Sequence, residues 1–159
     1  MAKEFDLNAR LVKFSTTAVK ISQRFPKIPA ANHIADQIAR SGLAPTRHYA
    51  EAQGAESPKD FIHKMKVGLK ELRETFNSLS VAKQMSWLPA TDFDWVLDEN
   101  DQLIAIFFTS IRTAQINSGI DITTKKDIDS PQDNEENKTD ENENEETDQK
   151  EYTDPSDGN

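Results

Sequence analysis

Apolar residues recur at alternating spacings of four and three along most of the first 120 residues of the chain. The run between residues 61 and 79 shows the pattern best, and its members are Phe61, Met65, Gly68, Leu72, Thr75 and Leu79. This spacing places the side chains in one narrow seam along an α-helix. Just before it, Ser57 can cap a helix, Pro58 suits the first helical position, and Asp60 follows three residues after the cap. We therefore predict a helix from Pro58 to about Met85.

A similar seam precedes this segment, between about Asp6 and Phe25. Its apolar members are Leu7, Leu11, Phe14, Ala18, Ile21 and Phe25. Asp6 is an N-cap residue type, and Pro26 ends the helix because the residue before a proline is disfavoured in the α region. A second helix, rich in small residues, is predicted from Pro29 to about Ala55, with Gly54 as its stop.

A fourth helix is predicted from Thr91, a capping residue type, to about Asn117. Its seam consists of Phe93, Val96, Asn100, Leu103, Phe107, Ile111 and Ala114. Asn100 is a polar residue at a seam position, where such residues can fix the register of packed helices. On the predicted third helix, Ile62, Leu69 and Phe76 widen the apolar face at seven-residue spacing.

These periods predict an all-α fold, an antiparallel up-down four-helix bundle over residues 1–120. Residues 121–159 differ in kind, since they hold 15 Asp or Glu, four Lys and almost no apolar side chain. Such a segment cannot bury enough surface to offset its chain entropy, so we predict a disordered acidic C-terminal tail. The tail accounts for the net charge of −9, because the rest of the chain is slightly basic.

The stretch between residues 37 and 79 also carries a family resemblance. The residues that carry it are Arg40, Ser41, Pro45, Ala50, Glu51, Gly54, Ser57, Phe61, Leu69, Glu71 and Leu72. They resemble the signature of small four-helix-bundle proteins first met in intervening sequences of large-subunit ribosomal RNA genes. Relatives of that family include the accessory protein of diversity-generating retroelements. The resemblance implies a homopentamer and, through those relatives, a reverse transcriptase as a partner.

Two sets of basic residues are candidates for nucleic-acid contact. The first, the basic row, is Lys59, His63, Lys66, Lys70 and Arg73, spaced to share one helix face about 21 Å long. The second, the basic line, is Arg10, Lys13, Lys20 and Arg24. RNA or DNA would meet such sets through its phosphates. The alternative interpretation is two ordinary solvated faces, and the lack of interleaved aromatic residues argues against base stacking.

The segment from Leu103 to Phe108 is apolar on nearly all sides of its predicted helix. A helix with one side exposed to solvent should carry polar residues on that side. Either the bundle of one chain covers the segment completely, or a neighbouring subunit does. Following the second interpretation, we predict an oligomer interface at Leu103, Ile104, Ile106, Phe107 and Phe108.

No motif in the sequence indicates catalysis. The chain has no Cys, no Gly-x-Ser-x-Gly and no glycine-rich phosphate loop. His48-x-x-Glu51 and Asp60-x-x-His63 depart from the pattern of di-iron bundles. We expect no enzyme, no cofactor and no metal.

The first residues lack an apolar signal core, and no apolar run is long enough for a membrane helix. We therefore expect a cytoplasmic protein with no membrane contact. Its predicted function is that of a non-catalytic, pentameric adaptor that contacts nucleic acid or a nucleic-acid-bound protein. The alternative is a structural ring for protein–protein interaction without a nucleic-acid role. The tail either competes with polyanions for the basic surface or only solubilises the protein.

Overall fold

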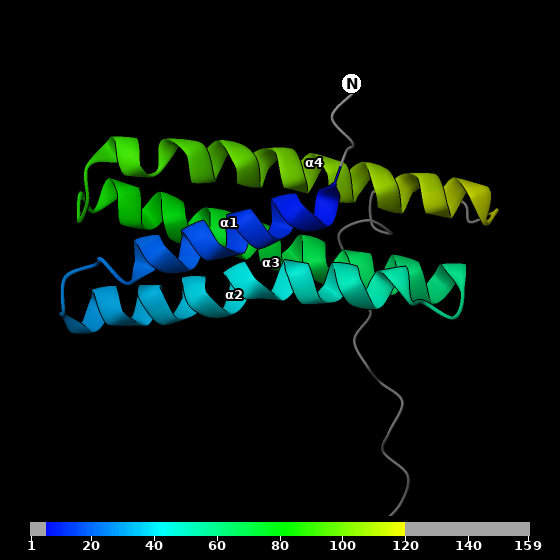
Figure 1. Cartoon of the computed structure of the whole chain (residues 1–159), viewed down its shortest axis with the longest axis horizontal. Helices are drawn as coiled ribbons and strands as arrows, with labels where there is room; N and C mark the ends of the chain where they lie inside the picture. Colours follow the sequence, from blue (N-terminus) through cyan, green and yellow to red (C-terminus); the bar gives the residue numbers. More distant parts are fainter. Residues whose placement is uncertain (1–5, 120–159) are drawn as a thin grey trace, which may run out of the picture. The chain divides into compact units, whose positions relative to one another are not determined.

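A computed structural model describes residues 6–119, which form four α-helices and one 3-10 turn (Figure 1). The elements are α1 (Leu7–Ser22), α2 (Pro29–Gln53), α3 (Pro58–Gln84), η1 (Ala90–Asp92) and α4 (Asp94–Asn117). Each helix packs against the next, and α4 also packs against α1, which closes a four-helix bundle. Residues 6–119 contain no strand, so the predicted all-α bundle is confirmed. The predicted acidic tail lies outside the described residues.

Side-chain caps begin α1 and α3 where the sequence predicts them. The Asp6 carboxylate accepts a hydrogen bond from the Ala9 backbone N–H at 2.9 Å. The Ser57 hydroxyl accepts one from the Asp60 N–H at 3.1 Å, and Pro58 occupies the first turn. Each cap satisfies a backbone donor that has no partner inside the helix.

The predicted start of the fourth helix at Thr91 is wrong. Residues 90–92 form the 3-10 turn η1, and α4 begins at Asp94 without a side-chain cap. Burial of Phe93 explains the difference, because its ring is fully enclosed and lies 6.4 Å from the ring of Phe25. Phe25 also contacts Trp87, with ring centroids 5.4 Å apart. These three aromatic residues position the chain at this end of the bundle.

The predicted seams form the core. All six seam residues of α1 and its following turn are buried. On α3 every seam residue is buried except Phe61, which is half-buried. Every seam residue of α4 from Phe93 to Ile111 is fully enclosed, including the polar Asn100. The four-and-three spacing therefore identifies the inward face of each of these helices.

The first helix is much shorter than the others. It has 16 residues, against 25, 27 and 24 in α2, α3 and α4, or about 24 Å against about 36–40 Å. Figure 1 shows that α1 accompanies the other helices along only part of their length. Between α3 and α4, Gly68 makes room for Phe107, whose Cε1 atom lies 2.7 Å from the point where a Cβ on Gly68 would be.

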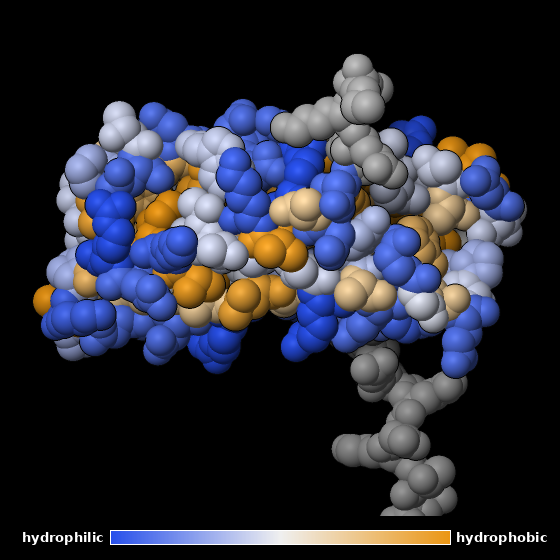
Figure 2. Space-filling model, in the orientation of Figure 1, coloured by the Kyte–Doolittle hydropathy of each residue, from blue (hydrophilic) through white to orange (hydrophobic). Residues whose placement is uncertain are grey.

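Apolar side chains also reach the surface. Figure 2 shows apolar patches among hydrophilic side chains on the face that it presents. The large apolar residues that are most exposed among the described ones are Val12, Ile28, Leu43, Val81, Met85, Trp95 and Ile116. None of them comes from the apolar segment of residues 103–108. None of the helices within residues 6–119 is both long and apolar enough to span a bilayer.

Candidate nucleic-acid interface

The basic row lies on the outward face of α3. Within the helix, Gly68, Leu72 and Thr75 face the core and are buried, and the row occupies the opposite side. Four of its residues, Lys59, His63, Lys70 and Arg73, are exposed, and Lys66 is half-buried. The structure thus brings all five predicted residues onto one side of one rigid helix.

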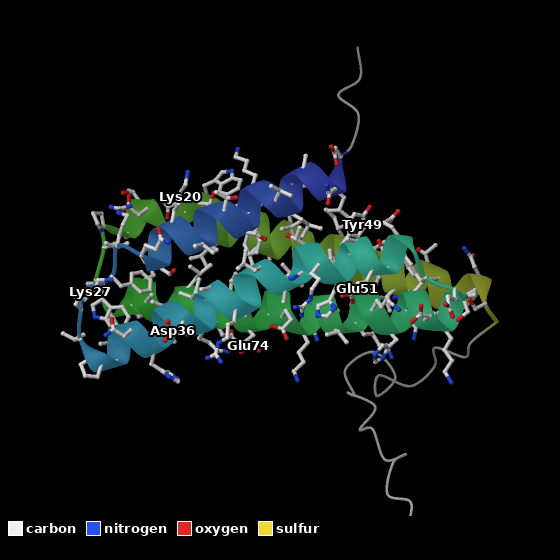
Figure 3. All side chains as sticks on the ribbon, turned by 60° about the horizontal axis from the view of Figure 1, so that its bottom comes forward. Lys20, Lys27, Asp36, Tyr49, Glu51 and Glu74 are labelled. Atoms are coloured by element: carbon white, nitrogen blue, oxygen red, sulfur yellow. The ribbon has the colours of Figure 1, made fainter. Side chains whose placement is uncertain are left out.

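Acidic side chains lie close to the basic row. The Asp60 carboxylate forms an ion pair with Lys64, one turn along α3 and outside the row. The hydrogen bond from Lys64 is the main reason why the pKa of Asp60 is lowered. Burial, followed by the charge of Glu74, raises the pKa of Glu71. Figure 3 shows Glu74 on α3 and Glu51 on the neighbouring α2, so the surface around the row is mixed in charge.

The basic line on α1 has a different role from the row. Arg10 binds the Glu99 carboxylate of α4 through two hydrogen bonds, of 2.7 and 3.0 Å, and the side chain of Gln102 at 2.9 Å. The hydrogen bond with Glu99 raises the pKa of Arg10. Because a bidentate guanidinium–carboxylate pair is strong and directional, Arg10 is primarily a link between α1 and α4.

Two further members of the line also contact the segment that leads into and begins α4. The Arg24 guanidinium lies 2.8 Å from the Asp92 carboxylate. The Lys13 ammonium lies 4.5 Å from the ring centroid of Trp95, a cation–π geometry. Lys20 is exposed, and Figure 3 shows it on α1. The basic line therefore makes mostly intramolecular contacts with η1 and α4, and nucleic-acid contact by Arg10, Lys13, Lys20 and Arg24 stays a prediction.

The partners of the basic line on η1 and α4 were not predicted from the sequence. Asp92, Trp95, Glu99 and Gln102 follow one another at spacings of three and four, which places the last three along one side of α4, with Asp92 just before that helix in η1. The residues of the basic line are also spaced to share one helix side, and this agreement between a basic and a partly acidic set is the sequence signal that could have paired them. Two complementary rows on the first and last helices of a four-helix bundle indicate adjacent, facing helices.

The predicted oligomer interface divides into three parts. Leu103 and Phe107 are fully enclosed in the core of the single chain, where a second copy cannot reach them. Ile104 and Phe108 are half-buried and one turn apart, so they share a side of α4. Ile106 is also half-buried, but at about 100° per residue it points away from that side. The prediction is thus restricted to Ile104, Ile106 and Phe108, and these three do not share one face.

The signature residues have structural contacts. The Ser41 hydroxyl donates to the Gln37 carbonyl at 2.9 Å and lies 2.8 Å from the hydroxyl of Thr75. Pro45 is buried inside a continuous α2. His48 and Glu51 lie 3.2 Å apart, one turn apart on α2. Among residues 6–119, no three His, Asp or Glu side chains lie close enough together to hold a metal ion.

The sequence between residues 3 and 108 matches the family described as 23S rRNA-intervening sequence protein. A similar solved structure is that of a protein of unknown function from the S23 ribosomal protein family of Bacteroides thetaiotaomicron VPI-5482. The two chains share 20% identity and a TM-score of 0.60 over 67% of this chain and 99% of that one. At this identity the comparison supports the fold alone. No curated protein matches the sequence.

Proposed function

Because the chain belongs to the family of 23S rRNA-intervening sequence proteins, we propose that it is a non-catalytic, oligomeric adaptor that binds nucleic acid through the basic row. The family description refers to insertions in a ribosomal RNA gene, which makes RNA or the corresponding DNA the first partner to test. A protein bound to nucleic acid, such as a reverse transcriptase, is the partner implied by the retroelement relatives.

The arrangement of the basic row carries the proposal. Its five side chains extend over about 21 Å of one helix, which allows them to meet several consecutive phosphates. The row also lies opposite the core, where the partner would not have to displace another helix. In a pentamer the row would occur five times, so individually weak contacts would add up through effective concentration.

A charge-swap experiment tests the proposal. The variant Lys66→Glu, Lys70→Glu, Arg73→Glu is compared with Lys27→Glu, Arg40→Glu, Arg112→Glu, three exposed positions outside both basic sets, which has the same net charge but leaves the row intact. Binding of fluorescein-labelled RNA and of duplex DNA is followed by anisotropy across salt concentrations. We expect the row variant to lose binding and to reduce the salt slope by about 2–3, while the control retains most of its affinity.

Three outcomes would contradict the proposal. The row variant could bind like the wild type, the two variants could lose affinity equally, or the wild-type protein could bind neither polymer at low salt. The last result would favour a ring for protein–protein interaction. Light scattering of all three proteins, expected at about five times the 17.9 kDa of one chain, checks that the substitutions leave the assembly intact.

A further inference from the structure

The side chain of Asn100 on α4 is an unexplained polar group in the core. It is fully buried, and neither its Nδ2 nor its Oδ1 atom has a hydrogen-bond partner among the described residues. Buried polar side chains in native proteins are almost always satisfied by protein groups or by ordered water. Asn100 is therefore a candidate for binding a small polar molecule inside the bundle.

Helix packing places a hydroxyl at the same level. Gly68 of α3 faces Phe107 of α4, as their close approach shows. Because the two helices are antiparallel, seven residues forward on α3 and seven residues back on α4 reach the same level. Those positions are Thr75 and Asn100, and both are fully buried seam residues.

Thr75 has unused hydrogen-bonding capacity. Its Oγ1 atom lies 2.8 Å from the Ser41 hydroxyl and 2.8 Å from the Glu71 carbonyl oxygen. A hydroxyl has one proton and two lone pairs. The Ser41 proton goes to the Gln37 carbonyl, so Ser41 can only accept a hydrogen bond from Thr75. The Thr75 proton points either to Ser41 or to Glu71. In either arrangement, Thr75 can still accept a hydrogen bond.

The first helix supplies a hydroxyl close to this level as well. The Ser15 hydroxyl donates to the carbonyl oxygen of Gly42, next to Ser41, at 2.7 Å, and it lies 2.8 Å from the Thr46 hydroxyl. Ser15, Ser41, Thr75 and Asn100 thus form a polar layer with one residue from each helix. Ser15 and Ser41 are satisfied by protein groups, whereas Asn100 is not.

We propose that Asn100 and Thr75 bind at least one ordered internal water molecule, which bridges the amide to the hydroxyl and completes the polar layer. The water donates a hydrogen bond to Thr75 Oγ1 and exchanges another with the Asn100 amide. A slip of α4 by one turn along α3 would bring Asn100 level with Leu72 or Leu79, which offer no hydrogen bond. The layer therefore stabilises the observed register, in which Arg10 meets Glu99.

Two measurements on the full chain test the inference. A crystal structure that resolves waters should show one within hydrogen-bond distance of both Asn100 and Thr75. In urea denaturation, Asn100→Leu and Thr75→Val each change the unfolding equilibrium constant by some factor. The double variant should change it by a factor at least about fivefold smaller than the product of the two single factors. Asn77→Leu, at an exposed position of α3, is the control and should combine with Thr75→Val multiplicatively.

Two results would overturn the inference. One is a crystal structure in which Asn100 has no water between it and Thr75, whether it bonds Thr75 directly or remains unpaired. The other is a cycle in which Asn100→Leu and Thr75→Val act as independently as the Asn77 control pair. Asn100→Leu replaces the amide by an apolar side chain of similar size in the core, so the variant is expected to fold.

Discussion

Replacement of Gly68 by Ala tests how tightly α3 and α4 pack. A Cβ at this position would lie 2.7 Å from Phe107 Cε1 and 3.4 Å from the Cβ of His48. The Phe107 ring is fully enclosed, so it can relieve the overlap only by displacing its neighbours. Overpacking of this kind costs about 1–3 kcal/mol. Because the enclosed ring cannot move aside, the cost is expected at the upper end of this range, about 2–3 kcal/mol. The better helix propensity of Ala returns up to about 1 kcal/mol, so the expected net loss is about 1–2 kcal/mol.

Gly42 within α2 and Gly54 directly after it provide a graded control. A Cβ on Gly42 would meet the Cβ of Ala18 at 3.3 Å, and one on Gly54 would meet nothing nearer than 3.8 Å. We expect Gly42→Ala to have an intermediate effect and Gly54→Ala to stay within about 0.5 kcal/mol of the wild type. Stability is measured by urea denaturation with far-ultraviolet circular dichroism, at one protein concentration because association adds to apparent stability.

A double variant identifies Phe107 as the cause. Phe107→Leu removes the ring edge that a Cβ on Gly68 would strike. Gly68→Ala and Phe107→Leu together should therefore cost about 1 kcal/mol less than the sum of the single changes. The reasoning is refuted if Gly68→Ala is as stable as the wild type, or if the two changes are additive.

Three more predictions follow from the structure. Because burial raises the pKa of Glu71, the folded state binds that proton more tightly than the unfolded chain does, and stability falls as the pH rises through this group's titration. Glu71→Gln should then stabilise the protein at neutral pH, and its advantage should disappear in urea titrations at acidic pH, below the usual range of a glutamate. Ser86 has a φ of 54° in the turn after α3, a backbone conformation that favours glycine. Ser86→Gly should therefore raise the unfolding free energy, measured by urea denaturation, by about 0.5 kcal/mol. A loss of stability would contradict the positive φ of this residue. Removal of residues 121–159 takes away 15 acidic and four basic side chains. Anisotropy at low salt should therefore show tighter RNA binding by the truncated chain. Equal binding at all salt concentrations would exclude a role for the tail in polyanion affinity.

Much of the fold could be predicted from the sequence because it depends on local rules. The seams report which side of each helix is inward, and the caps at Asp6 and Ser57 depend on residues only three positions away. The start of α4 could not be predicted in the same way. It depends on the burial of Phe93 against Phe25, a residue far away in the chain.

The candidate surface was only partly predictable for a related reason. Periodicity shows that a set of residues shares a helix face, but it does not show what lies opposite that face. The basic row faces outward on α3, whereas three members of the basic line meet partners on η1 and α4. Likewise, residues 103–108 are apolar on several sides because neighbouring helices of the same chain cover most of them.

The short first helix gives the protein a built-in optical probe. Both tryptophans of the chain lie beside it or its C-terminal turn, Trp95 under the ammonium of Lys13 and Trp87 against the ring of Phe25. The fluorescence emission of the two tryptophans therefore depends on whether α1 is packed against the other helices. A shift in fluorescence while the helical signal stays constant would mark the release of α1 from an otherwise intact α2–α3–α4 unit.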